Sequence, residues 1–150
     1  MVAPLGGASK TVPDTVYLDQ RLANLDPGRS VLSQLQDACR SATEADLRMR
    51  LARLDLDARK IVIPSESLSG GERLKAALAC VLYADPAPQL LLLDEPSNHL
   101  DLPSAEALET MLRGYRGALV LVSHDEVFLG KVGSTDRLRA SEQGWFLDAW

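Results

Sequence analysis

Residues 90–96 read Leu-Leu-Leu-Leu-Asp-Glu-Pro, and this stretch decides the fold of the chain. Four consecutive apolar residues before two acids are typical of a strand buried on both faces of a parallel sheet. The segment Ser104–Arg113 has helical periodicity, and Ala118–Val122 is a second apolar run that predicts another buried strand. The order strand, helix, strand predicts a parallel crossover, which places the carboxyl ends of both strands at one edge. The sequence therefore predicts an α/β fold.

Helices are predicted on the amino-terminal side of this strand. Ser30 can cap a helix over Val31–Cys39, and Thr43 can cap another over Glu44–Leu54. A longer helix fits Gly70–Ala84, because its apolar residues recur three and four positions apart. These segments predict a group of helices that precedes the sheet residues.

The two ends of the chain carry weaker signals. The segment Val12–Leu18 would form at most a short or edge strand, because Pro13 and Asp14 interrupt it. Asp125–Leu129 fits a short helix, and the tail predicts two small strands around Gly144.

Composition restricts the class of protein. The chain has 150 residues, 46% hydrophobic and 25% charged, which is enough to bury a sizeable core as one domain. A net charge of -5 argues against a broad electrostatic hold on nucleic acid or on an anionic membrane. No apolar run approaches the roughly 20 residues of a spanning helix, and no secretory signal is evident, so we expect a cytoplasmic protein. Cys39 and Cys80 lie in helix-like apolar contexts and are predicted to be buried free thiols.

The segment Leu68–Glu72, Leu-Ser-Gly-Gly-Glu, begins the long predicted helix. Ser69 and Glu72 stand three residues apart and can form a capping box, which is the structural interpretation. That interpretation leaves Gly70 and Gly71 unexplained, since each glycine costs roughly 1 kcal/mol in a helix relative to alanine. Glycines leave the backbone amides of a helix start uncovered, and such a start is a binding site for anions, usually phosphate.

Three polar side chains follow the two apolar strands. Asp94 at a strand's carboxyl end can lie beside the magnesium ion of a triphosphate, and Glu95 can orient a water molecule. Alternatively, both acids simply mark the polar end of a strand. His124 follows the second strand and is expected at the same edge as Glu95, although a lone histidine is more often structural.

The three motifs together resemble the ATP-binding cassette (ABC) ATPases. The segment Asn98–Asp101, Asn-His-Leu-Asp, is similar to the ABC-F family of duplicated cassettes, and Tyr17–Gln20 is similar to that family's glutamine loop. The resemblance covers about Val12–Trp150. It implies part of a P-loop-type ABC ATPase core, a parallel sheet with helices, plus a helical subdomain. It also implies ATP and Mg²⁺ as the ligands of the complete cassette.

The same resemblance implies a role for each residue of the motifs. Glu95 would be the general base, His124 would contact the γ-phosphate as the switch histidine, and Asp94 would ligate magnesium through water. Gln20 would sense the magnesium ion and the attacking water. The residues implied to act across a cassette dimer are Ser69, Gly70 and Gly71, which would hold the γ-phosphate of the partner's nucleotide, and Asp101, in the loop that contacts the partner.

One family motif has no match in the 150 residues. A phosphate-binding loop reads Gly-x-x-x-x-Gly-Lys-Ser/Thr, and at Lys10-Thr11 the glycine positions hold Pro4 and Ser9. We therefore expect a partial nucleotide-binding domain that is inactive alone. Its expected parts are a strand and glutamine-loop remnant at 1–25, a helical subdomain with the signature helix at 26–84, and the carboxyl-terminal part of the catalytic core at 85–150.

Several functions agree with these residues. The first is the carboxyl-terminal portion of an ABC-F cassette, whose parent hydrolyses ATP, pairs with a second cassette in the same or another chain, and acts on the ribosome. The second is a non-catalytic interaction or regulatory module that pairs with a complete cassette. A third is the ATPase subunit of an ABC transporter with a separate membrane subunit. The lobe of an SMC-type DNA repair ATPase is disfavoured, because no heptads precede Ser69. A sheet without its upstream strands would also expose a face or an edge, so we expect the chain to self-associate, to exchange a segment or to cover the sheet with Met1–Val12.

Overall fold

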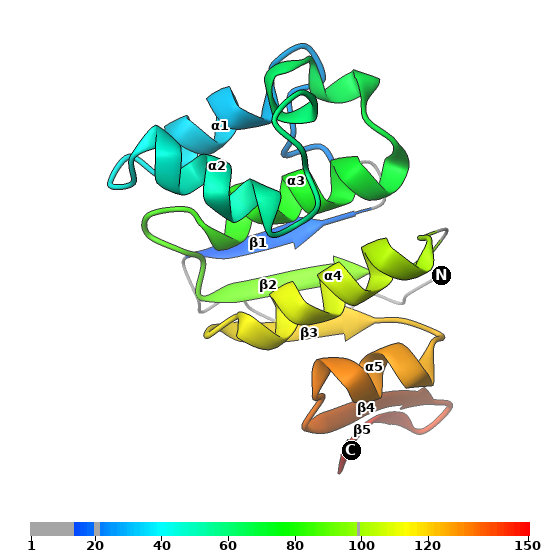
Figure 1. Ribbon diagram of the computed structural model, residues 1–150. Coiled ribbons are helices and arrows are strands. Elements are labelled where there is room, and N and C mark those ends of the chain that lie inside the picture. The colour runs from blue at the N-terminus through cyan, green and yellow to red at the C-terminus, as the bar shows by residue number, and fades with distance from the viewer. Residues whose placement is uncertain (1–13, 20–21, 99) are drawn as a thin grey trace.

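The computed structural model describes residues 14–19, 22–98 and 100–150 (Figure 1). In chain order, a short strand and a group of helices precede a strand-helix-strand unit, a short helix and a hairpin, as the sequence predicts, and two short 3₁₀ turns lie before the third helix. The elements are β1 (Thr15–Leu18), α1 (Val31–Ala38), α2 (Glu44–Ala52), the 3₁₀ turns Lys60–Val62 and Ser65–Ser67, α3 (Gly70–Leu82), β2 (Leu90–Asp94), α4 (Leu102–Gly114), β3 (Ala118–Val122), α5 (Glu126–Val132), β4 (Asp136–Ser141) and β5 (Gly144–Ala149).

A parallel sheet in the order β1-β2-β3 forms the centre of the fold. Its register aligns Leu18 with Leu93 and Asp94 with Val122, so all three strands end at one edge. The predicted α/β class and the parallel pairing are therefore confirmed. β1 is a short edge strand, as its interrupted sequence predicts. β4 and β5 form a separate antiparallel hairpin around the predicted Gly144 turn.

Helices cover one face of the parallel sheet (Figure 1). Leu91 and Leu93 of β2 are buried in the same hydrophobic core as Leu78 of α3 and Leu108 of α4. The helix starts are held as the sequence predicts, since side chains of Ser30, Thr43 and Ser69 each accept a backbone amide of the first helical turn.

The opposite face of the sheet is open, as expected for a sheet without its upstream strands, but the predicted burial of the strands on both faces is wrong. The run Ala118–Val122 was expected to be buried, yet Val120 is 46% and Val122 54% exposed. In β2 only alternate residues are buried, and Leu90 and Leu92 are half-buried. Since Tyr17, Leu92 and Val120 lie in register and side chains alternate along a strand, they share this face. No described element covers it.

The remaining global expectations can be checked directly. Cys39 is buried and Cys80 is partly buried, and both are free thiols, as predicted. Burial raises the pKa of the Cys80 thiol to about 12, so it stays protonated and unreactive at neutral pH. Within the described ranges, every helix is too short or too polar to cross a bilayer.

We expect the 150-residue chain to associate through the open face of its parallel sheet, because contiguous exposed apolar strands recruit partners. Val120→Glu should shift the chain towards monomer, since it places a charge at the centre of that face. Light scattering after size-exclusion chromatography, over a dilution series, measures this. The control is Val62→Glu, which adds the same charge at a valine that is 51% exposed in a 3₁₀ turn. A wild-type monomer at every concentration would contradict the expectation.

Candidate functional site

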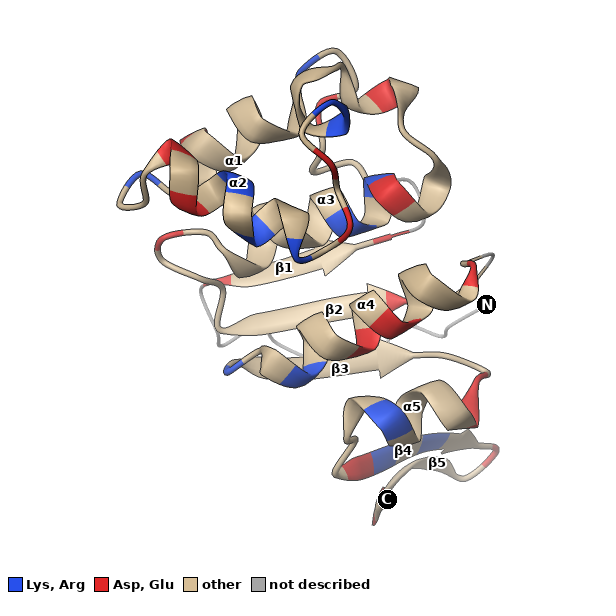
Figure 2. Cartoon of the chain, in the orientation of Figure 1, with Lys and Arg blue, Asp and Glu red and all other residues tan. Residues whose placement is uncertain are grey.

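The carboxyl edge of the parallel sheet gathers most of the candidate residues. Asp94 ends β2 opposite Val122 of β3, and the amide of Glu95 donates a 2.7 Å hydrogen bond to the Val122 carbonyl. Beyond β3, His124 Nε2 lies 3.3 Å from Glu95 Oε1. The structure thus brings Asp94, Glu95 and His124 to one place. Figure 2 shows acidic residues at the carboxyl end of β2 and at the start of α5.

Glu95 has two features that a simple strand-end acid would lack. Its backbone has a positive φ of 47°, a left-handed conformation that costs a non-glycine residue about 1–2 kcal/mol. Its side chain is only 13% exposed, and the buried Oε1 has no hydrogen-bond partner in the described part of the chain. Strain and an unsatisfied buried carboxylate oxygen both cost stability, and both concentrate at functional sites. This geometry favours the catalytic interpretation of Glu95.

The histidine beside Glu95 is open to solvent. The His124 side chain is 98% exposed, so nothing in the described chain fixes its ring beyond the approach to Glu95 Oε1. A core histidine would be enclosed and hydrogen-bonded. The structure therefore removes the main structural explanation for His124, and leaves a side chain that can meet a ligand arriving at this edge.

Asp94 has a partner that sequence reasoning missed. The Tyr17 hydroxyl donates a long hydrogen bond of 3.4 Å to Asp94 Oδ2, across the open face. Desolvation, followed by the negative charges of Asp94 and Asp19, raises the pKa of Tyr17, which keeps the hydroxyl a donor. Among the described residues no cation pairs with Asp94, so its carboxylate suits a hard cation such as Mg²⁺, which prefers oxygen ligands.

Ser69 forms the capping box that its sequence predicts. The Ser69 Oγ accepts a 3.3 Å hydrogen bond from the Glu72 amide, and the Ser69 amide donates a 2.9 Å hydrogen bond to Glu72 Oε2. Lys60 Nζ binds the other oxygen of Glu72 at 2.5 Å, and this contact and the Ser69 amide hold the pKa of Glu72 below its ordinary value. The cap does not use the Ser69 hydroxyl proton, so it can still be donated to an anionic oxygen.

The two glycines of α3 differ in their surroundings. A Cβ on Gly70 would meet nothing within 4 Å, so packing within the described chain does not require a glycine there. A Cβ on Gly71 would lie 3.0 Å from Ser104 Oγ and 3.4 Å from a methyl of Leu100, so Gly71 allows α3 to approach α4. The glycine at position 70 is therefore better explained by the close approach of a ligand. The glycine at position 71 is also explained by the packing of α3 against α4.

Asp101 caps α4 next to these glycines. Its Oδ1 accepts the Ser104 amide at 3.0 Å, and hydrogen bonds from Ser104 lower the pKa of the Asp101 carboxyl. Because Ser104 also faces Gly71, the starts of α3 and α4 lie side by side. Sequence reasoning did not single out Ser104, and the only signal for it is the spacing of three residues after Asp101. Gln20 lies outside the described residues.

Comparisons with known proteins give a family match and similar sequences. The family model described as ABC transporter matches residues 8–98. The ATP-binding protein YdiF of Bacillus subtilis is 38% identical over 79% of this chain. ATP-binding cassette sub-family F member 3 of Homo sapiens is 33% identical over 85% of it. The chain spans only 18% of the length of each of these two relatives.

Solved structures show the same fold. A dimeric ATP-binding cassette in a post-hydrolysis state with ADP and Pi superposes with a TM-score of 0.58 at 24% identity, over 77% of this chain and 54% of that one. An inward-facing transporter of the metal-chelate type gives a TM-score of 0.64 at 20% identity, over 91% of this chain and 58% of that one.

The two glycines provide a matched pair of substitutions. Gly70→Ala should keep or raise stability, by up to about 1 kcal/mol, because alanine favours helix and the space is free. Gly71→Ala should leave the chain about 1–3 kcal/mol less stable than Gly70→Ala, because its Cβ crowds Ser104. Urea unfolding measures both. Adding Ser104→Ala to Gly71→Ala should recover part of the loss, and equal stability of the two single variants would contradict the packing argument.

The charge of Glu72 should make stability depend on pH. Because its pKa is lowered in the folded chain, its contribution is complete above the ordinary value of 4.5 and is lost as the pH falls through the folded value. Glu72→Gln should therefore cost about 0.5–1 kcal/mol at neutral pH, and the difference should close in acid. Urea unfolding over a pH series measures it, with the exposed Glu66→Gln as control. A pH-independent difference would contradict this assignment.

Proposed function

Because the chain belongs to the ATP-binding cassette family, we propose that it supplies the hydrolytic edge of an ATP site. The observation that carries the proposal is Glu95, a strained residue whose buried Oε1 lacks a hydrogen-bond partner and faces His124. In this proposal Glu95 accepts the proton of the attacking water, and His124 contacts the γ-phosphate. Asp94 holds the magnesium ion of Mg-ATP through water, a role that fits a carboxylate with no cation beside it among the described residues.

We propose that the start of α3 serves a second cassette. Ser69, Gly70 and Gly71 would bind the γ-phosphate of a nucleotide that the second cassette mainly holds. That cassette would belong to the same chain of the parent protein or to another chain. The free space at Gly70 and the unused Ser69 proton support this role. Asp101 caps α4 next to Gly71 and would contact the partner from there, while Gln20 would sense the magnesium ion and the water.

The parent protein is proposed to be an ABC-F-like ATPase that acts on the ribosome, in the cytoplasm, rather than on a transported solute. The support is the similarity to sub-family F member 3 and the Asn-His-Leu-Asp segment after Glu95. The proposed parts of the cassette are residues 1–25, 26–84 and 85–150. One observation favours a second candidate, a non-catalytic module that pairs with a complete cassette: the 150 residues contain no match to the phosphate-binding loop.

Glu95→Gln distinguishes the two functions. In a protein that joins this chain to a phosphate-binding loop, the substitution should preserve ATP binding and slow hydrolysis at least about 100-fold, as expected for loss of a general base. His124→Ala should slow hydrolysis less. Steady-state phosphate release and calorimetric titration with Mg-ATP measure the two steps.

The matched control is Glu106→Gln, an exposed glutamate of α4, which should leave turnover unchanged. The 150-residue chain alone should neither hold ATP tightly nor turn it over, because no phosphate-binding loop positions the substrate. Near-normal hydrolysis by Glu95→Gln would reduce Glu95 to a strand-end acid and favour the non-catalytic module.

A further inference from the structure

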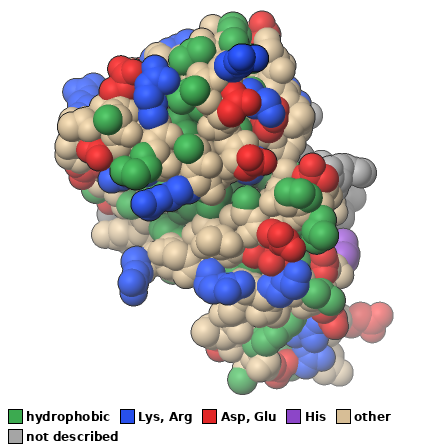
Figure 3. All heavy atoms as spheres, in the orientation of Figure 1, with side chains coloured by type: hydrophobic (Ala, Val, Ile, Leu, Met, Phe, Trp, Pro, Cys, Tyr) green, Lys and Arg blue, Asp and Glu red, His purple; other side chains and the backbone are tan. Residues whose placement is uncertain are grey.

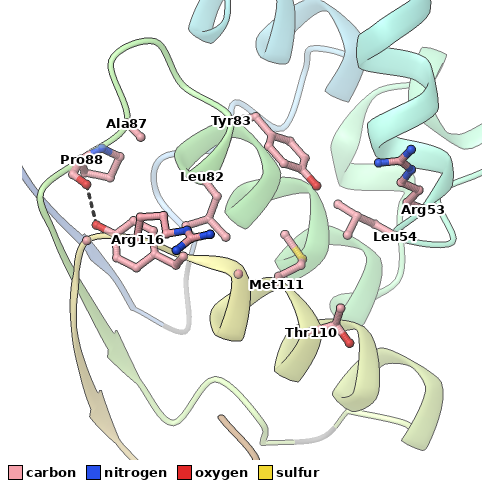
Figure 4. A pocket seen from close by; sticks show the side chains of 12 residues that line it. Arg53, Leu54, Leu82, Tyr83, Ala87, Pro88, Thr110, Met111 and Arg116 are labelled. Carbon is pink, nitrogen blue, oxygen red and sulfur yellow. Dashed lines mark hydrogen bonds between the residues drawn. The ribbon is translucent and has the colours of Figure 1, made fainter. Parts of the chain in front are cut away.

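A cavity of about 370 Å³ lies at the other end of the helices, away from the carboxyl edge of the sheet (Figure 4). Its walls come from the carboxyl ends of α2, α3 and α4, from the loop that leads into β2, and from the loop between α4 and β3. The volume is within the roughly 300–1,000 Å³ of pockets that bind small molecules. Nothing proposed for the ATP site uses these residues.

The inner surface of the cavity is apolar and fixed in place. Leu54 and Met111 are buried at its base, and Leu82 packs beside them. The Tyr115 hydroxyl donates a 2.5 Å hydrogen bond to the Pro88 carbonyl, which fixes the ring to the loop before β2. A Cβ on Gly117 would collide with that hydroxyl, so the glycine permits this position of the tyrosine. This part of the cavity wall is therefore held in a defined position.

The charges around the cavity are all positive. Among the described residues that line it, only Arg53 and Arg116 are charged, and they lie on opposite sides of it (Figure 4). Neither pairs with a carboxylate of the described chain. Arg50 does not line the cavity, but its guanidinium stands 5.2 Å from the centre of the ring of Tyr83, which does. On the outer surface, Figure 3 shows basic side chains along the boundary between the upper helices and the layer below them.

Helix dipoles reduce this positive charge but do not cancel it. Three helices end at the cavity, at the caps Arg53, Tyr83 and Tyr115, and each carboxyl end carries roughly -0.5 charge. Their sum of about -1.5 is slightly smaller in magnitude than the charge of about +2 that Arg53 and Arg116 carry. A modest positive excess beside an apolar wall suits a ligand with one negative group and an apolar body, in a chain whose net charge is -5.

We propose that this cavity binds a small anionic amphiphile, a carboxylate, sulfonate or phosphate ester on an aromatic or aliphatic body. The apolar body would occupy the space against Leu54, Leu82 and Met111, and the anion would lie between Arg53 and Arg116. Burial of the body drives binding, and the charge-assisted contacts select an anion. Because the cavity joins α2 and α3 to α4, the bound ligand would also tie these helices together.

The test compares anilinonaphthalene sulfonate with uncharged phenylnaphthylamine, as fluorescent probes of the 150-residue chain. The sulfonate should bind more tightly than the uncharged probe. The double variant Arg53→Ala/Arg116→Ala should weaken sulfonate binding at least about tenfold, while the uncharged probe changes little. Thr110→Trp fills the cavity from α4 and keeps both arginines. It should therefore abolish binding in the cavity for both probes.

The matched control is Arg40→Ala/Arg59→Ala, which removes two exposed arginines that do not line the cavity. Both double variants change the net charge equally, so only a local effect distinguishes them. All variants keep the open sheet face, so any probe that binds there contributes the same signal in every variant. Equal sulfonate affinity in the two double variants, or undiminished binding by Thr110→Trp, would overturn the proposal.

Discussion

The parallel pairing of β2 with β3 is the constraint on which the rest of the structure depends. It aligns Asp94 with Val122, and the Glu95 amide continues the ladder by donating to the Val122 carbonyl. Parallel strands end at one edge, so the acids after β2 and the histidine after β3 must meet there. A register shift of one residue would turn Leu91 and Leu93 out of the core and reverse the faces of the acids. Burial of those leucines therefore fixes the geometry of the candidate site as well as the fold.

Local sequence was sufficient for the elements and insufficient for what covers them. Capping residues such as Ser30 and Thr43 mark helix starts because they satisfy backbone amides within three residues. The run Ala118–Val122 gave the bounds of β3 correctly, since β-branched and apolar residues favour a strand wherever it lies. Whether both faces are buried depends on distant segments, and an apolar run contains no information about them. The open face at Val120 and Val122 is therefore a tertiary property.

For the candidate site, too, the sequence indicates the residue types but not their detailed geometry. Residue types and spacing predict two acids and a histidine at one edge of the sheet, and a separate glycine-rich helix start. They do not predict the positive φ of Glu95 or the isolation of its Oε1, because both result from how the chain leaves β2 beside β3. The Tyr17 contact with Asp94 depends on the register of β1, which pairs Leu18 with Leu93, 75 residues later in the sequence. Spacing along the chain cannot show such a contact.

Helix α3 links the two ends of the molecule that carry chemistry. At its start, Ser69 and Glu72 form the capping box and Lys60 holds Glu72, next to the glycines proposed to meet a phosphate. At its end, Tyr83 lines the cavity with Arg50 against its ring. Thirteen helical residues span about 20 Å at 1.5 Å per residue, and the middle of the helix, Ala76–Ala79, is buried on all sides. A buried, close-packed helix moves as a unit, because sliding part of it would open voids in the core. A change in how α3 sits against α4 at the cavity would therefore also alter the contact of Gly71 with Ser104, so the cavity and the signature glycines share one rigid element.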